Sequence, residues 1–287
     1  MQEEQHIQVT KASGERVPFD PEKLRTSLAR SGATVELSAT ILEEILPRLA
    51  AGISTKKLYR IAFNLLHQRS KNLAARYRLK QAIMDLGPSG FPFERFIARI
   101  LEHDGYRTEV GSIVEGKCVK HEVDVIALKG EQHFMVECKY HHPGRFCDVK
   151  IPLYIQARFK DVEEQWRLIP GHGTKFHQGW LVTNTRFTSD ALQYGHCAGL
   201  YLMSWDHPRK ESLKDRIDRS GLYPLTCLSS LTRAEKQQLL DLGVVLCHEI
   251  CKEPAWLSKA GVRPARFDAV LKEGAELCAT LIHHGQH

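Results

Sequence analysis

Residues 121–141, HEVDVIALKGEQHFMVECKYH, decide the fold of this chain. Two apolar runs, VDVIA and HFMVEC, are separated by KGEQ, whose Lys-Gly pair is a turn signal. The pattern predicts a β-hairpin with an acid on each arm, Asp124 and Glu137. Because side chains alternate along a strand, Glu137 and Lys139 share one face. Buried charges are costly unless they are paired or metal-bound, so these residues predict a site for a divalent cation and a polarised water.

The identity of the first acid is open between two residues. Glu122 and Asp124 lie on the same face of the expected strand, and Asp124 is nearer its apolar centre. We therefore place the strand carboxylate at Asp124. Taken alone, the Glu-Cys-Lys triplet at 137–139 is also compatible with an exposed strand edge that carries an ordinary surface ion pair.

The elements on both sides of the hairpin predict an α/β domain at residues 89–207. A helix with an apolar face begins at FPFERFIARI (91–100), ends near Gly105 and is followed by a strand. After the hairpin, the sequence predicts a helix over 152–169, a buried strand at GWLVTN (179–184), a helix at 189–199 and a last buried strand at LYLMSWD (200–206). The resulting order is αβββαβαβ.

This order and its motifs resemble the Mrr-like restriction endonucleases of the PD-(D/E)XK nuclease superfamily. The motifs that carry the resemblance are FERF (93–96), EVDV (122–125), ECKY (137–140) and YIQARF (154–159). The resemblance implies a restriction-endonuclease-like fold that hydrolyses DNA phosphodiester bonds with Mg²⁺ or Mn²⁺. It implies that Asp124, Glu137 and the backbone carbonyl of Cys138 hold the metal. It further implies catalytic roles for Glu94, Lys139 and Gln156.

The first segment, residues 1–88, predicts a small domain with a hairpin and four helices. Two short strands, HIQVTK (6–11) and RVPF (16–19), flank a turn at ASGE (12–15). Asp20 precedes Pro21 at a helix start, and Ser54 or Thr55 caps a later helix. The last helix runs through LAARYRLKQAIMDL (73–86) and ends at GPSG (87–90).

This segment resembles the ATP-cone, a nucleotide-binding regulatory domain. The matching stretches are VTKASGERVPFDPEKL (9–24), GISTKKLY (52–59) and LAARYRLK (73–80). The resemblance implies binding of ATP or dATP through the residues Val9, Lys11, Lys23, Thr55 and Lys80. The family has an arginine after the strand lysine where this chain has Ala12. A degenerate cone that is kept as a packing module is the alternative.

The third segment, residues 208–287, predicts a helical domain with less specific signals. The turns LLDLGV (239–244) and SKAGV (258–262) resemble those of helix-hairpin-helix DNA-binding units, but the glycine-rich hairpin of that motif is missing. A plain helical packing domain explains the segment equally well.

Composition limits the class of protein. The chain has 287 residues, a net charge of +6 and eight scattered cysteines without a CxxC pair. This usage favours free thiols in a reducing cytoplasm, and no apolar run is long enough for a membrane span. Residues Cys138, His141, His142 and Cys147 are possible zinc ligands, but their spacing does not match common structural zinc sites.

Two functions follow from these patterns. The first is a DNA endonuclease controlled by nucleotide binding to the cone, in restriction or defence, with a homodimer or a higher homo-oligomer as the form that cuts both strands. The second is a nucleotide-sensing DNA-binding regulator that does not cleave. A structure-specific or RNA-directed nuclease stays open within the first class, whereas a ribonucleotide reductase is excluded because no catalytic barrel follows the cone.

Overall fold

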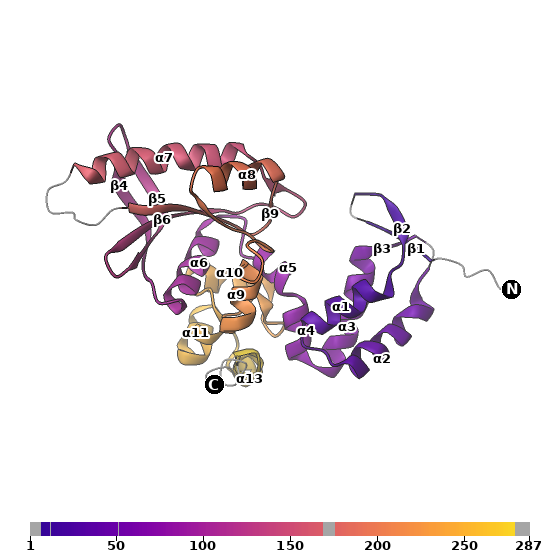
Figure 1. The fold of residues 1–287 in the computed structure, drawn as a ribbon. Coiled ribbons are helices and arrows are strands. Elements are labelled where there is room, and N and C mark those ends of the chain that lie inside the picture. Colours follow the sequence, from indigo (N-terminus) through magenta and orange to yellow (C-terminus); the bar gives the residue numbers. More distant parts are fainter. Residues whose placement is uncertain (1–6, 12, 51, 169–175, 279–287) are drawn as a thin grey trace. The chain divides into compact units, whose positions relative to one another are not determined.

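The computed structural model describes residues 7–11, 13–50, 52–168 and 176–278. The chain divides into two compact units (Figure 1). The first unit contains Met1–Leu79 with Cys227–Ser229, and the second contains Lys80–Thr226 with Ser230–His287. Each unit is described by itself below.

The first unit is built on a three-stranded sheet in the order β2-β1-β3. The strands are β1 Gln8–Thr10, β2 Arg16–Pro18 and β3 Ile53–Ser54. The predicted hairpin is present, since β1 and β2 are antiparallel, but the parallel strand β3 was not predicted. With only two residues, β3 is too short to show an alternating pattern in the sequence.

Helices complete the first unit, and each has a physical reason to begin where it does. They are α1 Pro21–Arg30, α2 Val35–Ile45, η1 Leu46–Arg48, α3 Thr55–Arg69 and α4 Lys71–Tyr77. The side chains of Asp20, Thr34, Ser54 and Ser70 cap their first turns. Leu28, Ile41 and Leu66 are fully buried in the core between the helices. The predicted last helix is interrupted after Tyr77, and its second part is α5 Leu79–Met84.

The second unit contains the predicted αβββαβαβ order. Its elements are α6 Phe91–His103, β4 Arg107–Glu115, β5 Lys120–Lys129, β6 Gln132–Lys139, β7 Phe146–Cys147, α7 Lys150–Arg167, β8 Phe176–Thr183, β9 Arg186–Phe187, α8 Ser189–Cys197 and β10 Tyr201–Met203. Five strands form one mixed sheet in the order β10-β8-β6-β5-β4, and the unpredicted short strands β7 and β9 pair with each other. The predicted fold is therefore confirmed, with one small added ladder.

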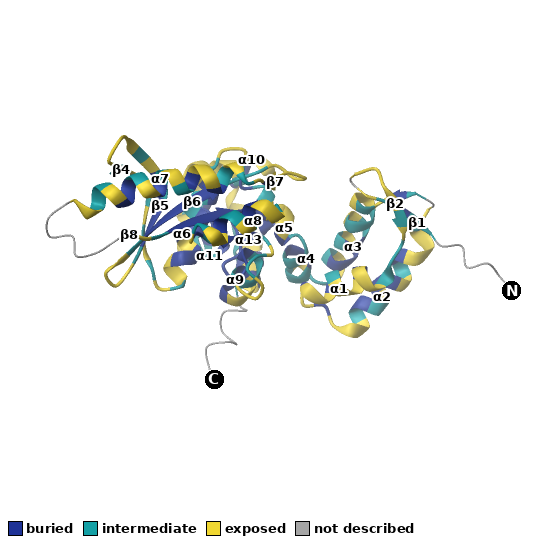
Figure 2. Ribbon diagram, turned by 45° about the horizontal axis from the view of Figure 1, so that its top comes forward, coloured by how far each residue is buried: buried dark blue, intermediate teal, exposed yellow. Residues whose placement is uncertain are grey.

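The sheet lies between helices on both faces. Helices α7 and α8 cover one face and α6 covers the other (Figure 1). Most residues of β6 and β8 are buried (Figure 2). Phe93 and Phe96 of α6 have no exposed surface, and Met135 packs with Phe159 of α7 on the opposite face. The central strands are thus held between two close-packed layers of side chains.

The C-terminal helices belong to the same compact unit as the sheet, except for residues Cys227–Ser229 at the end of η2 and after it. They are α9 Leu213–Ser220, η2 Leu225–Cys227, α10 Arg233–Asp241, α11 Cys247–Lys252, α12 Ala255–Lys259, η3 Pro264–Arg266 and α13 Phe267–Cys278. Helix α6 is bound to them, because Arg95 donates to the carbonyl of Gly243 at 3.0 Å and Arg99 donates to Glu249 at 3.0 Å. These contacts join the segment to helix α6, and a separate domain at 208–287 remains a sequence-based proposal.

Two further observations concern the chain as a whole. All eight cysteines are free thiols. None of the helices in the described part of the chain combines the length and the apolar composition needed to cross a bilayer.

Candidate active site

The two acids of the hairpin lie where its two strands separate. The turn between β5 and β6 contains Gly130, which has a positive φ. From this turn the two strands pair with each other, beginning with Lys129 opposite Gln132 and ending with Val125 opposite Val136. The next position in this register holds Asp124 and Glu137, and no pairing is formed there. Beyond this point β5 continues along β4, and β6 continues along β8. The sheet therefore opens a fork with one carboxylate on each side.

Asp124 turns its side chain back to the opposite arm of the fork. Its Oδ2 accepts a hydrogen bond of 2.7 Å from the backbone N–H of Cys138. Burial raises the pKa of Asp124 above its ordinary value, although that hydrogen bond and the charge of Lys139 act in the opposite direction. Glu122, the other candidate, is exposed. The arrangement favours Asp124 as the strand carboxylate.

Glu137 is a fully buried carboxylate with one unused oxygen. Its Oε2 lies 2.5 Å from Arg158 Nη1 and 3.6 Å from Lys139 Nζ. Its Oε1 is buried and has no hydrogen-bond partner in the described structure. Burial and the charge of Asp124 raise the pKa of Glu137 to about 7, and these effects outweigh the two cations. A buried carboxylate oxygen without a partner is costly unless a cation or a proton reaches it.

Glu94 approaches the fork from α6. It lies in the first turn of that helix and is partly buried. Burial raises its pKa to about 7, and the charge of Asp124 adds to this shift while Lys139 opposes it. Glu94 is therefore within electrostatic reach of both residues. The structure brings together the four charged residues that the sequence predicted, which come from one helix and two strands.

Gln156 lies on α7 and has a different environment from the charged residues. Its Oε1 is buried and accepts no hydrogen bond within the described residues. No bond joins it to Asp124 or Glu137 in this part of the chain. Its catalytic role stays a prediction, and its unused oxygen is available to a water or a substrate.

Arg158, which sequence reasoning missed, is the cation nearest to Glu137. Its guanidinium group also donates to the backbone carbonyl of Glu122 and, at 3.4 Å, to His121 Nδ1. His121 in turn contacts Asp161 through Nε2 at 2.8 Å. The hydrogen bond from His121, together with backbone donors, lowers the pKa of Asp161 to about 2. This chain of contacts orients Arg158. The only signal in the sequence is its place in the YIQARF motif, two residues after Gln156.

The donor set fits a hard divalent cation. Mg²⁺ prefers oxygen ligands and usually keeps several waters beside one or two carboxylates. Asp124 and Glu137 supply two carboxylates, and the unused Oε1 of Glu137 is the acceptor that a cation would satisfy. No group of three or more His, Cys, Asp or Glu side chains with metal-binding geometry occurs among the described residues, so the zinc alternative gains no support. The predicted carbonyl ligand, Cys138, stays a prediction.

The residues predicted to bind nucleotide divide between the two units. Val9 is buried in the central strand β1. Lys11 and Thr55 directly follow the parallel strands β1 and β3, in which Thr10 is paired with Ser54, and so leave the sheet at the same edge. Lys23 lies in the first turn of α1, 3.4 Å from Asp20. Ala12 lies outside the described residues.

Lys80 is the exception, because it belongs to the second unit. Its Nζ lies 5.7 Å from the centroid of the Trp205 ring. Within the second unit this lysine lies beside the loops that follow β6 and β8, and its contact with nucleotide stays a prediction.

Comparison with known families and structures matches each part of the chain. The model of the ATP cone domain matches residues 7–83, that of the restriction endonuclease (Mrr) catalytic domain matches 87–207, and that of the AF1548-like C-terminal region matches 223–278. An uncharacterized protein from Archaeoglobus fulgidus is 36% identical over 154 residues, which cover 54% of this chain and 83% of the relative.

A solved structure supports the same relationship. The crystal structure of a protein of unknown function, AF1548, has 31% sequence identity and a TM-score of 0.56, and the match covers 67% of this chain and all of that one. The high coverage of both relatives extends the likeness beyond a shared fold. The chain belongs to the AF1548-like proteins, with an Mrr-like restriction endonuclease domain of the PD-(D/E)XK superfamily that follows an N-terminal ATP-cone.

Proposed function

We propose that this protein is a Mg²⁺-dependent endodeoxyribonuclease that hydrolyses phosphodiester bonds of DNA and responds to ATP or dATP bound in the cone. The observation that carries the proposal is the fork between β5 and β6. It presents Asp124 and the buried Glu137 side by side, with Lys139 Nζ 3.6 Å from Glu137. In an ordinary surface ion pair the carboxylate stays exposed to water, whereas here it is buried and one of its oxygens has no partner among the described residues.

Each residue of the fork has a distinct chemical task. Asp124 and Glu137 hold the metal, with Mn²⁺ as an alternative to Mg²⁺. When bound, such an ion lowers the pKa of a water ligand and neutralises charge that develops on the phosphate. Lys139 has 27% of its side chain exposed, so it reaches the substrate side, where it orients the attacking water and stabilises the transition state. Glu94 assists from α6, and Gln156 offers its unused oxygen to the same water.

The cone supplies the regulatory part of the proposal. Lys11, Lys23 and Thr55, next to strand ends and helix starts, suit a polyphosphate, because lysines and helix N-termini attract phosphate. Nucleotide bound there changes oligomeric state or access to the nuclease site. The effect is allosteric if nucleotide and DNA cleavage are energetically coupled. A homodimer is the simplest assembly for cutting both strands, and a role in restriction or defence follows from the family alone.

The decisive experiment is cleavage of supercoiled plasmid by the full-length protein with Mg²⁺, Mn²⁺ or EDTA, with and without ATP or dATP. Wild type, Asp124→Ala, Lys139→Ala and Glu122→Ala are compared. Glu122→Ala is the matched control, since it removes an acid from the same strand outside the fork. We expect nicking or linearisation by the wild type and Glu122→Ala only, and a change in rate with nucleotide.

Two outcomes contradict the proposal. Retained DNA binding without cleavage under any metal or nucleotide supports the non-cleaving regulator. Cleavage of a single-stranded or structured RNA in place of DNA, in a parallel assay, assigns the site to a different polymer. Loss of cleavage in Glu122→Ala with full activity in Asp124→Ala reverses the choice of strand carboxylate.

A further inference from the structure

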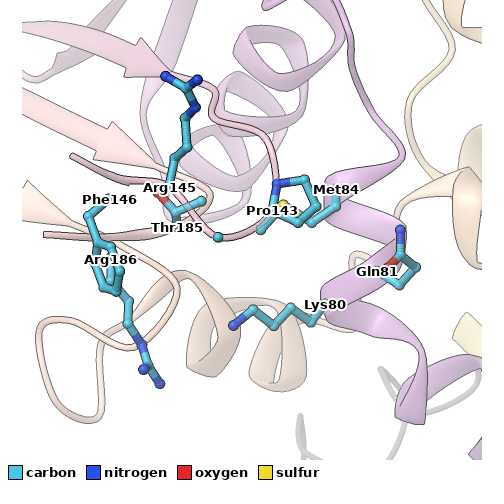
Figure 3. A pocket seen from close by; sticks show the side chains of 9 residues that line it. Lys80, Gln81, Met84, Pro143, Arg145, Phe146, Thr185 and Arg186 are labelled. Atoms are coloured by element: carbon cyan, nitrogen blue, oxygen red, sulfur yellow. The ribbon is translucent and has the colours of Figure 1, made fainter. Parts of the chain in front are cut away.

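A pocket of about 260 Å³ lies within the second unit, against the loop that follows Lys139. Helix α5 forms one wall, and the loops that follow β6 and β8 form the others (Figure 3). Its lining includes three cations, one from each wall, together with a methionine, a phenylalanine and a threonine, namely Lys80, Arg145, Arg186, Met84, Phe146 and Thr185. Phe146 leaves about half of its surface, 53%, exposed. Apart from the predicted nucleotide contact of Lys80, the predicted roles of the chain leave this pocket unassigned.

The walls of the pocket are attached to the catalytic strands. The loop that contains Arg145 begins directly after Lys139, the last residue of β6. The buried side chain of Asn184, one residue after β8, accepts from His141 N at 2.8 Å and donates to His141 O at 2.9 Å. Tyr140 donates to the backbone carbonyl of Met84 in α5. The pocket therefore keeps a fixed position relative to Lys139.

The pocket has more positive than negative charge. Arg186 is paired with Asp206 at 2.6 Å, which neutralises one of the three cations. Burial and the charge of Arg186 lower the pKa of Lys80, and Asp206 offsets this only in part. Arg145 has no side-chain partner in the described structure. Lys80 points from α5 across the opening, whereas the guanidinium end of Arg145 extends away on the other side (Figure 3).

The free end of Arg145 links this pocket to the catalytic lysine. Burial lowers the pKa of His141, the charges of Arg145 and Lys139 lower it further, and the charge of Asp148 opposes them. Both cations therefore lie close to His141. Positive charge continues from Lys139 through Arg145 to Lys80 and Arg186, which is the arrangement that follows a phosphate backbone.

We propose that this surface follows the backbone of the DNA strand that is cleaved, with Lys80 contacting a phosphate in the pocket and Arg145 contacting a neighbouring phosphate outside it. This inference rests on the nuclease function proposed above. The volume is below the roughly 300–1,000 Å³ of pockets that enclose drug-sized ligands, so it suits one phosphate and its sugar better than a whole nucleoside triphosphate. The exposed ring of Phe146 offers a stacking surface to the attached sugar or base.

The test is the salt dependence of DNA binding by the full-length protein in EDTA, where no cleavage occurs. A labelled duplex is titrated with wild type, Lys80→Ala, Arg145→Ala and Arg107→Ala at several salt concentrations. Arg107 is the matched control, because it is exposed and lies at the end of β4 that pairs with Leu128, away from the fork. Each phosphate contact contributes about −0.9 to the slope of log affinity against log salt.

We expect the slope to weaken by about 0.9 in Lys80→Ala and in Arg145→Ala, and to stay unchanged in Arg107→Ala. Unchanged slopes in both pocket variants overturn the proposal. A second arm titrates ATP and inorganic phosphate: loss of ATP binding in these variants with unchanged DNA slopes assigns the pocket to free nucleotide and also overturns it. If the slopes weaken in a protein that cleaves no plasmid, the pocket binds DNA but the proposed nuclease function is refuted. Failure of the nuclease proposal and failure of the pocket proposal therefore give different results.

Discussion

The raised pKa of Glu137 makes the stability of the metal-free protein depend on pH in a specific direction. Its pKa is raised from 4.5 to about 7 in the folded state by burial and by Asp124. Between these values the folded protein holds a proton that the unfolded chain has released. The stabilising contribution of the protonated form is therefore complete below pH 4.5, and it decreases as the pH rises through the window and is lost above pH 7.

The magnitude follows from the size of the shift. Each pKa unit corresponds to about 1.36 kcal/mol, so the window from 4.5 to about 7 represents about 3 kcal/mol of unfolding free energy. Glu137→Gln keeps the shape and the acceptor for Arg158 but cannot ionise. Relative to the wild type, we expect this variant to gain about 3 kcal/mol between pH 4.5 and pH 8. Glu94 also has a pKa of about 7, but it titrates in both proteins. The difference between their pH dependences is therefore due to Glu137.

Urea unfolding in EDTA at pH 5, 6, 7 and 8 measures this difference. All four tryptophans, Trp166, Trp180, Trp205 and Trp256, lie in the second unit, so their fluorescence reports its unfolding and not that of the cone. Mg²⁺ at pH 8 should then stabilise the wild type more than Glu137→Gln, because it binds the ionised carboxylate. Superimposable pH dependences for the two proteins would refute the assignment of a buried, proton-binding carboxyl to Glu137.

Three further predictions address the residues around the fork and the core of the cone. Arg158→Ala removes the strongest cation acting on Glu137, so the pKa of Glu137 rises. The acid limb of the pH–rate profile of cleavage then moves to higher pH. Arg167→Ala, on the same helix, is the control and leaves the profile unchanged. Asn184→Ala removes both hydrogen bonds to His141 and lowers the tryptophan-detected stability by about 1–3 kcal/mol. Leu66→Ala, in the buried core of the first unit, costs about 2–5 kcal/mol and lowers the circular-dichroism transition of the cone, while tryptophan-detected unfolding keeps its midpoint.

Local patterns in the sequence were sufficient to predict the central hairpin and its charged residues. The apolar runs at 123–127 and 133–138 form β5 and β6, and their turn contains Gly130 with a positive φ. Alternation correctly places Glu137 and Lys139 on one side, where their charged atoms lie 3.6 Å apart. These features depend on neighbouring residues along the chain, so they can be predicted without knowledge of the fold.

Features that depend on distant or very short segments were not predictable. Arg158 is 21 residues from Glu137, and no periodic pattern reveals that its side chain crosses from α7 to β6. The two-residue strands β3, β7 and β9 carry no alternation, so only pairing in three dimensions defines them. Lys80 was predicted to bind nucleotide from its place in the LAARYRLK stretch, whereas its proximity to Trp205 and to the loops after β6 and β8 involves distant segments and was not predictable.

The charge balance of the fork links metal binding to DNA binding. Glu94, Asp124 and Glu137, when ionised, face the cations Lys139 and Arg158, which leaves one negative charge. A phosphodiester is repelled by this metal-free arrangement, and a divalent cation reverses its sign. Arg158 must then share Glu137 with the metal, since it holds the Oε2 atom while Oε1 stays free. Metal and DNA should therefore bind with positive cooperativity at the fork, while the pocket around Lys80 and Arg145, which is positive without metal, holds the strand in either state.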